Sequence, residues 1–171
     1  MGIYSNNIHR TLTDQYIKYI IEHQENVIEA FNRYGELLCQ KLGIPVSSLE
    51  QNCKNHDKSK FSTYEFEGYR QYFYHVSGEK RDEELFKKSW LHHQNNNMHH
   101  PEYWVLRTET GIAETLDMPD LYIAEMLIDW AAMSMKFNDT VEKYYNKKGY
   151  SHPFSEKTRN KVESLLSIFN N

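Results

Sequence analysis

The spacing of apolar and aromatic side chains predicts a chain built from helices. From about Thr13 to Leu42, such residues recur every three or four positions, which is the period of one helix face. They are Tyr16, Ile20, Val27, Phe31, Tyr34 and Leu38. Gly43 followed by Pro45 ends this first predicted helix, because neither residue readily continues a helix.

The rest of the chain shows the same period with clear start signals. Ser47 with Glu50, and Ser62 with Glu65, form capping-box patterns that predict two helix starts. Five further predicted helices follow the first. One begins at Ser47, and the others cover Ser62 to Val76, about Asp82 to Asn97, near Pro119 to about Tyr145, and Ser155 to Phe169. No stretch alternates as a strand would, so the predicted fold is all-α with five or six helices.

Composition narrows the class of protein. The 171 residues carry 20 Lys and Arg against 24 Asp and Glu, whereas a dedicated nucleic-acid-binding surface is usually basic. Aromatic residues make up 14%, which argues against disorder. No apolar run is long enough to span a membrane, and no apolar signal segment opens the chain. Cys39 and Cys53 form no CxxC motif, so we expect two reduced thiols in a cytoplasmic protein.

Histidine is the residue type that points to chemistry. The chain has nine, and five of them are His56, His92, His93, His99 and His100. Imidazole is the commonest metal ligand among protein side chains. A surface helix has no need of so many, so this grouping predicts a metal site.

Two placements near the start of the chain allow both a metal and an ordinary interpretation. His23 lies on the apolar stripe of the first predicted helix, where a lone histidine is more often a buried residue with a hydrogen-bond partner than a ligand. His56-Asp57 sets a nitrogen donor beside a carboxylate that can bridge two cations. The ordinary alternative for this pair is a helix-terminal histidine followed by a capping aspartate.

The run from His92 to His100 holds four histidines within nine residues. His92 and His99, or His93 and His100, are seven positions apart, so we expect each pair to share one helix face. A merely solvated helix end is the alternative. Against it stand the flanking aromatic residues Trp90, Tyr103 and Trp104. Closely grouped histidines of this kind are typical of a metal site.

Asp129 interrupts an apolar run, with Met126-Leu127-Ile128 before it and Trp130-Ala131-Ala132-Met133 after it. A carboxylate inside a buried helix costs too much free energy unless it is paired or bound to a cation. Asp129 is therefore either a metal ligand or the partner of a basic residue.

The order of these residues on an all-α chain resembles the HD-domain metal-dependent phosphohydrolase superfamily, over about His23 to Asp129. Four longer blocks are similar to a small, uncharacterised HD-like family of bacterial and phage proteins: Asn55-His56-Asp57-Lys58-Ser59-Lys60-Phe61-Ser62, Trp90-Leu91-His92-His93-Gln94, Asn97-Met98-His99-His100-Pro101-Glu102-Tyr103-Trp104 and Glu125-Met126-Leu127-Ile128-Asp129-Trp130. The resemblance implies a single HD-type helical bundle over residues 1–171, with the metal-site frame at 23–129 and C-terminal helices to 171.

The resemblance also implies the ligands of the metal ions. One ion would be held by His23, His56, Asp57 and Asp129. A second would be held by Asp57, His93 and either His99 or His100, with the two ions about 3.5–4 Å apart as in two-metal hydrolases. The family pattern favours His93 over His92. Mixed imidazole and carboxylate ligands suit iron, manganese, cobalt or zinc better than calcium.

Lys60, three residues after Asp57, is the predicted substrate-binding residue. Its spacing is similar to that of the phosphate-contacting lysine of the HD-GYP cyclic-dinucleotide phosphodiesterases, although the GYP tripeptide is absent. The alternative is a solvated loop lysine.

Together these features predict a metal-dependent phosphoric ester hydrolase that uses Asp57 and Lys60 in catalysis. Its partner would be a small phosphorylated substrate such as a nucleotide. We expect no membrane partner, and the sequence allows a homo-oligomer. A di-iron oxygenase of HD type and a non-catalytic metal- or nucleotide-binding protein are the alternatives.

Overall fold

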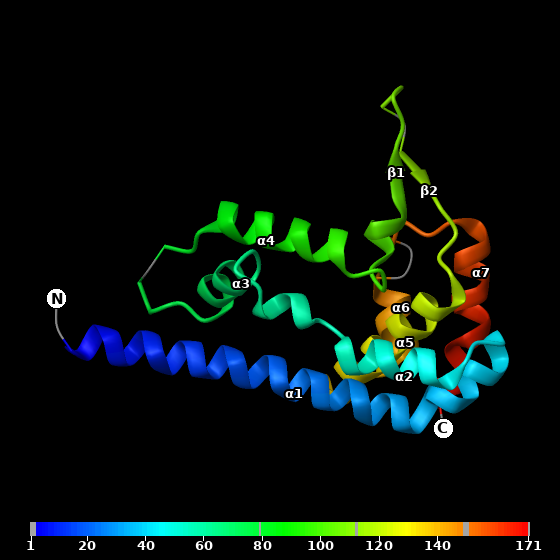
Figure 1. Cartoon of the computed structure of the whole chain (residues 1–171), viewed down its shortest axis with the longest axis horizontal. Coiled ribbons are helices and arrows are strands. Elements are labelled where there is room, and N and C mark those ends of the chain that lie inside the picture. Colours follow the sequence, from blue (N-terminus) through cyan, green and yellow to red (C-terminus); the bar gives the residue numbers. More distant parts are fainter. Residues whose placement is uncertain (1–2, 79, 112, 149–150, 171) are drawn as a thin grey trace. The chain divides into compact units, whose positions relative to one another are not determined.

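The computed structural model describes residues 3–78, 80–111, 113–148 and 151–170. Its contacts divide the chain into two compact units. The first unit comprises the residues up to His23 together with Asp57–Asn97, and the second comprises Gln24–His56 together with the residues from Met98 onward. The long helix α1 (Ile3–Leu42) contributes its first half to one unit and its second half to the other (Figure 1).

The first unit consists of helices around a small aromatic core. After the start of α1 come the 3₁₀ helix η1 (Lys58–Phe61), α3 (Phe66–Phe73) and α4 (Glu83–Asn96). Tyr16 and Ile20 of α1 pack with Tyr69 of α3 in the core. Partly buried aromatic rings extend this core; they are Tyr19, Phe66, Tyr74 and Phe86. The α4 helix begins where Asp82 accepts a hydrogen bond from the Leu85 amide at 2.9 Å.

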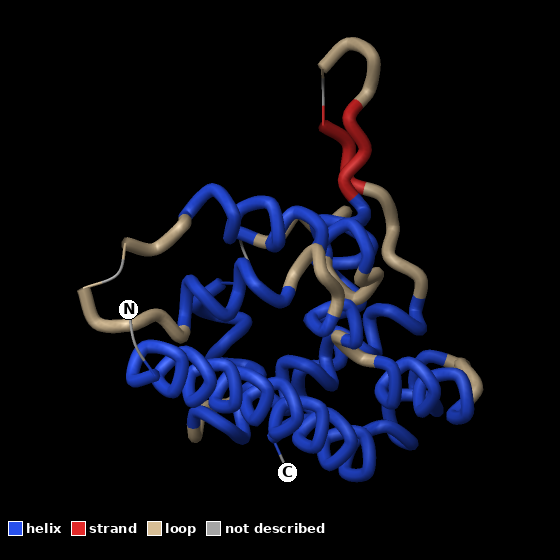
Figure 2. Tube along the Cα trace, turned by 60° about the vertical axis from the view of Figure 1, so that its left-hand side comes forward, coloured by secondary structure: helices blue, strands red, loops and turns tan. Residues whose placement is uncertain are grey.

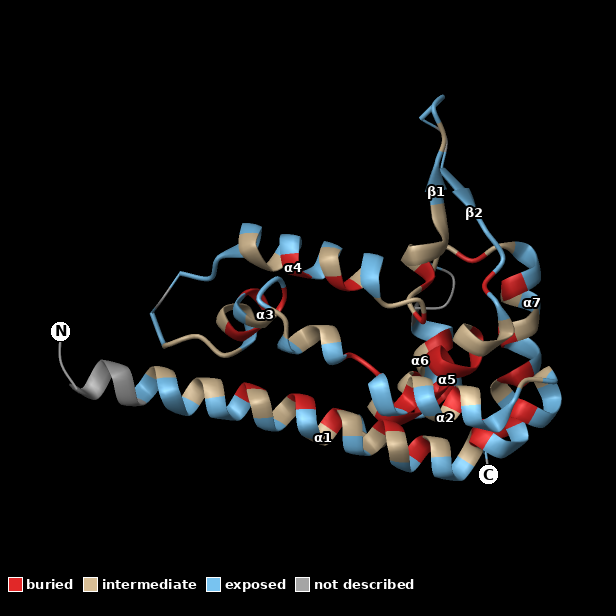
Figure 3. Ribbon diagram, in the orientation of Figure 1, coloured by how far each residue is buried: buried red, intermediate tan, exposed pale blue. Residues whose placement is uncertain are grey.

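The second unit is built around α5 (Asp120–Phe137), whose residues are mostly buried (Figure 3). The helices α2 (Val46–Asn55), α6 (Val141–Lys148) and α7 (Glu156–Leu165) pack against α5. The 3₁₀ helices η2 (Pro101–Trp104) and η4 (Leu166–Asn170) complete the helical part. Cys39 and Cys53 are buried in this core and form no disulfide.

A two-stranded antiparallel hairpin also belongs to the second unit, drawn in red in Figure 2. It pairs β1 (Val105–Arg107) with β2 (Ala113–Thr115), and Leu106 lies opposite Glu114. The prediction that no strand forms is therefore wrong. Because β2 is exposed along its whole length, neither strand has a buried face that would impose apolar and polar alternation on the sequence.

The helical prediction is otherwise broadly confirmed, although the described part of the chain has seven α-helices where five or six are predicted. The helix predicted from Pro119 to Tyr145 is in fact two, because Asn138 adopts a left-handed φ of 51° and ends α5. The first helix starts about ten residues before the predicted Thr13, and Tyr4, Ile8 and Leu12 already continue the four-residue spacing that leads to Tyr16. None of the described helices combines the length and the apolar character that a membrane crossing requires.

Both predicted capping boxes are wrong. The α2 helix begins at Val46 after Pro45, without a side-chain cap, and Glu50 instead pairs with Lys54. The α3 helix begins four residues later than predicted, at Phe66. Glu65 precedes it but caps nothing, because its carboxylate is engaged by histidines of α4.

Candidate metal centres

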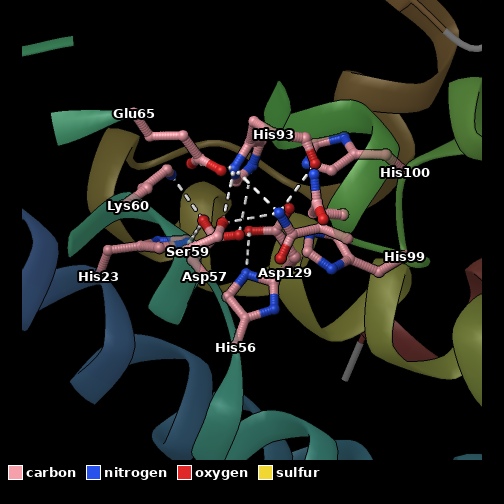
Figure 4. Close-up of polar contacts among 12 residues, drawn as sticks. His23, His56, Asp57, Ser59, Lys60, Glu65, His93, His99, His100 and Asp129 are labelled. Atoms are coloured by element: carbon pink, nitrogen blue, oxygen red, sulfur yellow. Dashed lines mark hydrogen bonds and ion pairs between the residues drawn. The ribbon is translucent and has the colours of Figure 1, made fainter. Parts of the chain in front are cut away.

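In the first unit, the carboxylate of Asp57 is the centre of a polar cluster (Figure 4). Asp57 precedes η1 with a φ of 55°, in the left-handed region that aspartate enters more readily than most residues. Its Oδ2 lies 2.6 Å from Lys60 Nζ and 3.8 Å from His23 Nε2. Its Oδ1 lies 3.3 Å from His93 Nε2. We call these four residues, together with Glu65, the first cluster.

Glu65 is a fully buried glutamate that meets two histidines of α4. Its Oε1 lies 2.7 Å from His92 Nδ1, and its Oε2 lies 2.8 Å from His93 Nδ1. Burial by itself would raise the pKa of Glu65, but the hydrogen bonds with His93 and His92 outweigh burial and hold this pKa below its usual range. Glu65 is therefore a carboxylate at neutral pH.

In the second unit, α5 places Glu125 and Asp129 one helical turn apart, so both carboxylates project from one face. Glu125 Oε1 lies 3.1 Å from His56 Nδ1 and 3.3 Å from His99 Nδ1. Asp129 Oδ1 lies 3.6 Å from His56 Nε2. Asn52 donates a 2.8 Å hydrogen bond to Glu125 Oε2. We call His56, His99, Glu125 and Asp129 the second cluster.

The second cluster is shielded from solvent, since His56 is 1% exposed and Glu125 is 6% exposed. Burial by itself would raise the pKa of Glu125. The hydrogen bonds with His56 and His99 outweigh burial and lower the pKa to about 2. An ionised carboxylate held beside two imidazoles is a donor set that first-row transition metals bind.

The spacing of the donor atoms fits such an ion. The ligand atoms of His56, His99 and Glu125 all lie within 4.8 Å of one another. A tetrahedral ion with ligands about 2.0–2.2 Å away keeps its ligand atoms about 3.3–3.6 Å apart. The imidazole–carboxylate separations of 3.3 Å at His93–Asp57 and 3.6 Å at His56–Asp129 fall in this range. Buried His and carboxylate residues of this protein could therefore hold a metal ion.

The structure distributes the predicted ligands over the two clusters. His23, Asp57 and His93 lie in the first cluster, and His56, His99 and Asp129 lie in the second. His100 follows His99 with its ring centroid 4.4 Å away, and its Nδ1 lies 3.9 Å from Glu102. Of the two adjacent histidines of α4, His93 is buried, whereas the His92 side chain is 28% exposed.

The prediction that histidines seven apart share a helix face is wrong. The α4 helix ends at Asn96, and Asn97 is extended with a φ of −122° and a ψ of 102°. His99 and His100 therefore lie in the turn that follows α4. His99 is buried there by its contacts with Glu125 and His56, not by continuation of α4.

Lys60 is not the solvated loop lysine of the alternative interpretation. Its side chain is 15% exposed and forms an ion pair with Asp57. Its Nζ also lies 5.8 Å from the centre of the Tyr69 ring. The predicted phosphate-binding lysine is thus held directly at the carboxylate of the first cluster.

Sequence reasoning missed the two buried glutamates. The capping-box spacing from Ser62 accounts for Glu65 in the sequence, so nothing there signals its burial. Glu125 stands four residues before Asp129 within the same apolar run, and that spacing could have marked it as a second buried carboxylate on the same face. Asn52, which holds Glu125, carried no signal of its own.

Comparison with known proteins adds a family. A family model described as "Family of unknown function (DUF5662)" matches residues 12–168, which is most of the chain. The chain belongs to the DUF5662 family. The region matched by DUF5662 contains every residue of both clusters. No curated protein and no solved structure matches the chain. Because the DUF5662 description assigns no activity, function has to be argued from the clusters.

Proposed function

We propose that this protein is a metal-dependent phosphohydrolase that acts on a nucleotide or a similar small phosphate ester. The observation that carries the proposal is the environment of Asp57. A buried carboxylate faces the Nε2 atoms of His23 and His93, and it also holds the ammonium of Lys60. Metal ligands beside a half-buried cation favour phosphate-ester hydrolysis, because both stabilise negative charge on the phosphate.

The ligand assignment follows the chemistry of each cluster. In the first, His23, Asp57 and His93 offer imidazole and carboxylate donors. In the second, His56 and Asp129 offer the same pair of donor types. These donors suit iron, manganese, cobalt or zinc. The assignment of His23, His56, Asp57 and Asp129 to one ion rests on the family resemblance and stays a prediction.

When bound, such an ion polarises phosphate oxygens and lowers the pKa of a coordinated water to about 7. Asp57 would hold that ion in position and carry the negative charge that attracts it. Lys60 would bind a phosphate oxygen as a point charge. Within the first cluster, Lys60 is the side chain that can only donate hydrogen bonds, since an ammonium group has no acceptor.

The test is hydrolysis by protein of defined metal content. The chain is stripped with a chelator, reloaded separately with Mn²⁺, Fe²⁺, Co²⁺ or Zn²⁺, and offered nucleoside mono-, di- and triphosphates, cyclic nucleotides and p-nitrophenyl phosphates. We expect phosphate-ester cleavage with at least one ion. Cleavage should be lost in Asp57→Asn and kept in the control Glu67→Gln, which removes an exposed charge paired with Arg70.

Two results would contradict the proposal and identify an alternative. Tight nucleotide binding without turnover under every ion would indicate a binding protein. Dioxygen consumption by the iron-loaded chain, without phosphate-ester cleavage, would indicate an HD-like di-iron oxygenase.

A further inference from the structure

Each unit contains one buried glutamate that meets the Nδ1 atoms of two histidines. In the first unit, Glu65 Oε1 lies 2.7 Å from His92 Nδ1, and Glu65 Oε2 lies 2.8 Å from His93 Nδ1. In the second unit, Glu125 Oε1 lies 3.1 Å from His56 Nδ1 and 3.3 Å from His99 Nδ1. A buried glutamate that faces two imidazole Nδ1 atoms thus occurs twice, once just before α3 and once on α5.

This arrangement determines where the imidazole protons lie. A carboxylate oxygen can only accept, so each histidine that bonds to it must carry its proton on Nδ1. Even a protonated glutamate could donate to only one of its two histidines. With Nδ1 protonated, the neutral ring presents Nε2 as its lone-pair donor.

The Nε2 atoms of His93 and His56 face aspartate carboxylates. His93 Nε2 lies 3.3 Å from Asp57 Oδ1, and His56 Nε2 lies 3.6 Å from Asp129 Oδ1. Each of these histidines therefore has a glutamate on one ring nitrogen and an aspartate near the other. The ring nitrogen beside the glutamate is suited to holding the imidazole in place, and the ring nitrogen near the aspartate is suited to binding an ion.

Glu125 is itself close enough to His56 and His99 to be considered a ligand. Its oxygens are already engaged, however. Oε1 faces both imidazole Nδ1 atoms, and Oε2 accepts from the Asn52 amide at 2.8 Å. An ion bound to Oε1 would have to displace one of the two imidazoles, whereas an ion at the Nε2 side displaces none of these partners.

We infer that Glu65 and Glu125 are positioning residues that fix the Nδ1–H tautomer of His93, His56 and His99, so that Nε2 is the metal-binding atom. This inference rests on the metal site of the proposed function. Carboxylates that orient metal-bound histidines typically change metal affinity 10- to 100-fold when they are removed.

The first measurement reads the tautomers in metal-free protein, by long-range ¹H–¹⁵N NMR on a chain labelled at histidine and kept in chelator. We expect His56, His93 and His99 of the wild type to carry their proton on Nδ1. Detection of the Nε2–H tautomer at His93 or His56 would overturn the inference. This result needs neither bound metal nor a variant that folds.

The second measurement compares Co²⁺ affinity by the visible absorption of the bound ion. Glu65→Gln and Glu125→Gln should bind Co²⁺ about 10- to 100-fold more weakly than the wild type and keep its spectrum. The controls Glu67→Gln and Glu163→Gln should leave affinity unchanged, because these glutamates pair with Arg70 and Tyr145 instead. Unchanged affinity in Glu65→Gln and Glu125→Gln would refute a positioning role, and a changed Co²⁺ spectrum would make the glutamate a ligand.

Failure of the inference and failure of the proposed function can be told apart. A wild type with Nδ1–H tautomers that binds Co²⁺ but cleaves no phosphate ester would leave the inference standing and overturn the hydrolase proposal. A wild type that binds no metal would overturn both, because no ion would then be present for the glutamates to serve.

Discussion

The ammonium of Lys60 lies 2.6 Å from the Oδ2 of Asp57, and the Asp57 side chain is only 4% exposed. Lys60 follows Asp57 by three residues within η1, so the local backbone brings the two groups together. A buried carboxylate without a nearby positive charge would be costly. Lys60 therefore neutralises Asp57 in the metal-free chain. Under the proposed function, the same ammonium would bind the substrate phosphate.

Lys60→Ala should leave metal content intact and lower catalytic efficiency. Loss of one charge-assisted bond to phosphate corresponds to about 1.5–3 kcal/mol, or roughly 10- to 150-fold in kcat/KM. Lys60→Arg should restore part of the activity, because it keeps the charge but not the ammonium geometry. Steady-state kinetics on the metal-loaded protein measure this. The matched control is Lys58→Ala, an exposed lysine of the same short helix. Kinetics equal to the wild type in Lys60→Ala would show that the lysine serves Asp57 alone.

The lowered pKa of Glu125 predicts a pH dependence of stability in the metal-free protein. A carboxyl group whose pKa falls from 4.5 in the unfolded chain to about 2 in the fold stabilises the fold above pH 4.5. That contribution disappears as the pH falls toward 2. Its size at neutral pH is about 3 kcal/mol.

Glu125→Gln should therefore unfold more easily than the wild type at pH 7, and the difference should shrink as the pH is lowered. Urea unfolding at several pH values in chelator gives both curves. Parallel curves for the two proteins would show that Glu125 is not held as a carboxylate by His56 and His99.

Gly68 allows α3 and α4 to approach closely. A Cβ at this position would lie 2.9 Å from the backbone carbonyl oxygen of Leu85, and it would collide with the hydroxyl group of Ser89. Gly68→Ala should lower the free energy of unfolding by about 1–3 kcal/mol, the usual cost of overpacking. Lys88→Ala, at an exposed position of α4, is the control. Thermal melts measure this change. An unchanged melting temperature in Gly68→Ala would mean that α3 and α4 can move apart without loss of stability.

Much of this fold is predictable because the local signals and the tertiary contacts agree. The Tyr16–Leu38 stripe predicts α1, and Asp82 caps α4 at the expected place. The failures arise where a side chain satisfies a tertiary partner in place of a local one. Glu65 has capping-box spacing, but two imidazoles and a buried environment outcompete the helix amide.

The candidate ligands were predictable for a different reason. A carboxylate such as Asp129, within an apolar helix, needs a compensating partner whatever the details of the fold. Orientation was not predictable. The predicted end of α4 at about Asn97 is confirmed to within one residue, but nothing in the sequence shows that the following turn places His99 against Glu125 and His56. The supporting glutamates likewise became visible only through their contacts.

The number of bound ions is a separate prediction. The histidines from His92 to His100 exceed what one four-ligand ion requires, so we expect two ions per chain at saturation. Titration of the stripped protein with Mn²⁺, followed by equilibrium dialysis and mass spectrometry of the metal, measures this number. Saturation at a single ion, with unchanged affinity after His93→Ala, would contradict a second site.

The most direct test of metal binding by these clusters is the metal content of purified wild type, His56→Ala and Asp57→Ala, measured by inductively coupled plasma mass spectrometry after identical loading and desalting. Circular dichroism of each sample establishes that it is folded, and Glu67→Gln serves as the control for loss of one carboxylate. We predict that the wild type and Glu67→Gln retain a divalent transition metal, whereas folded His56→Ala and Asp57→Ala lose most of it. Full metal occupancy in both alanine variants, or a wild type that retains no metal, would contradict the account.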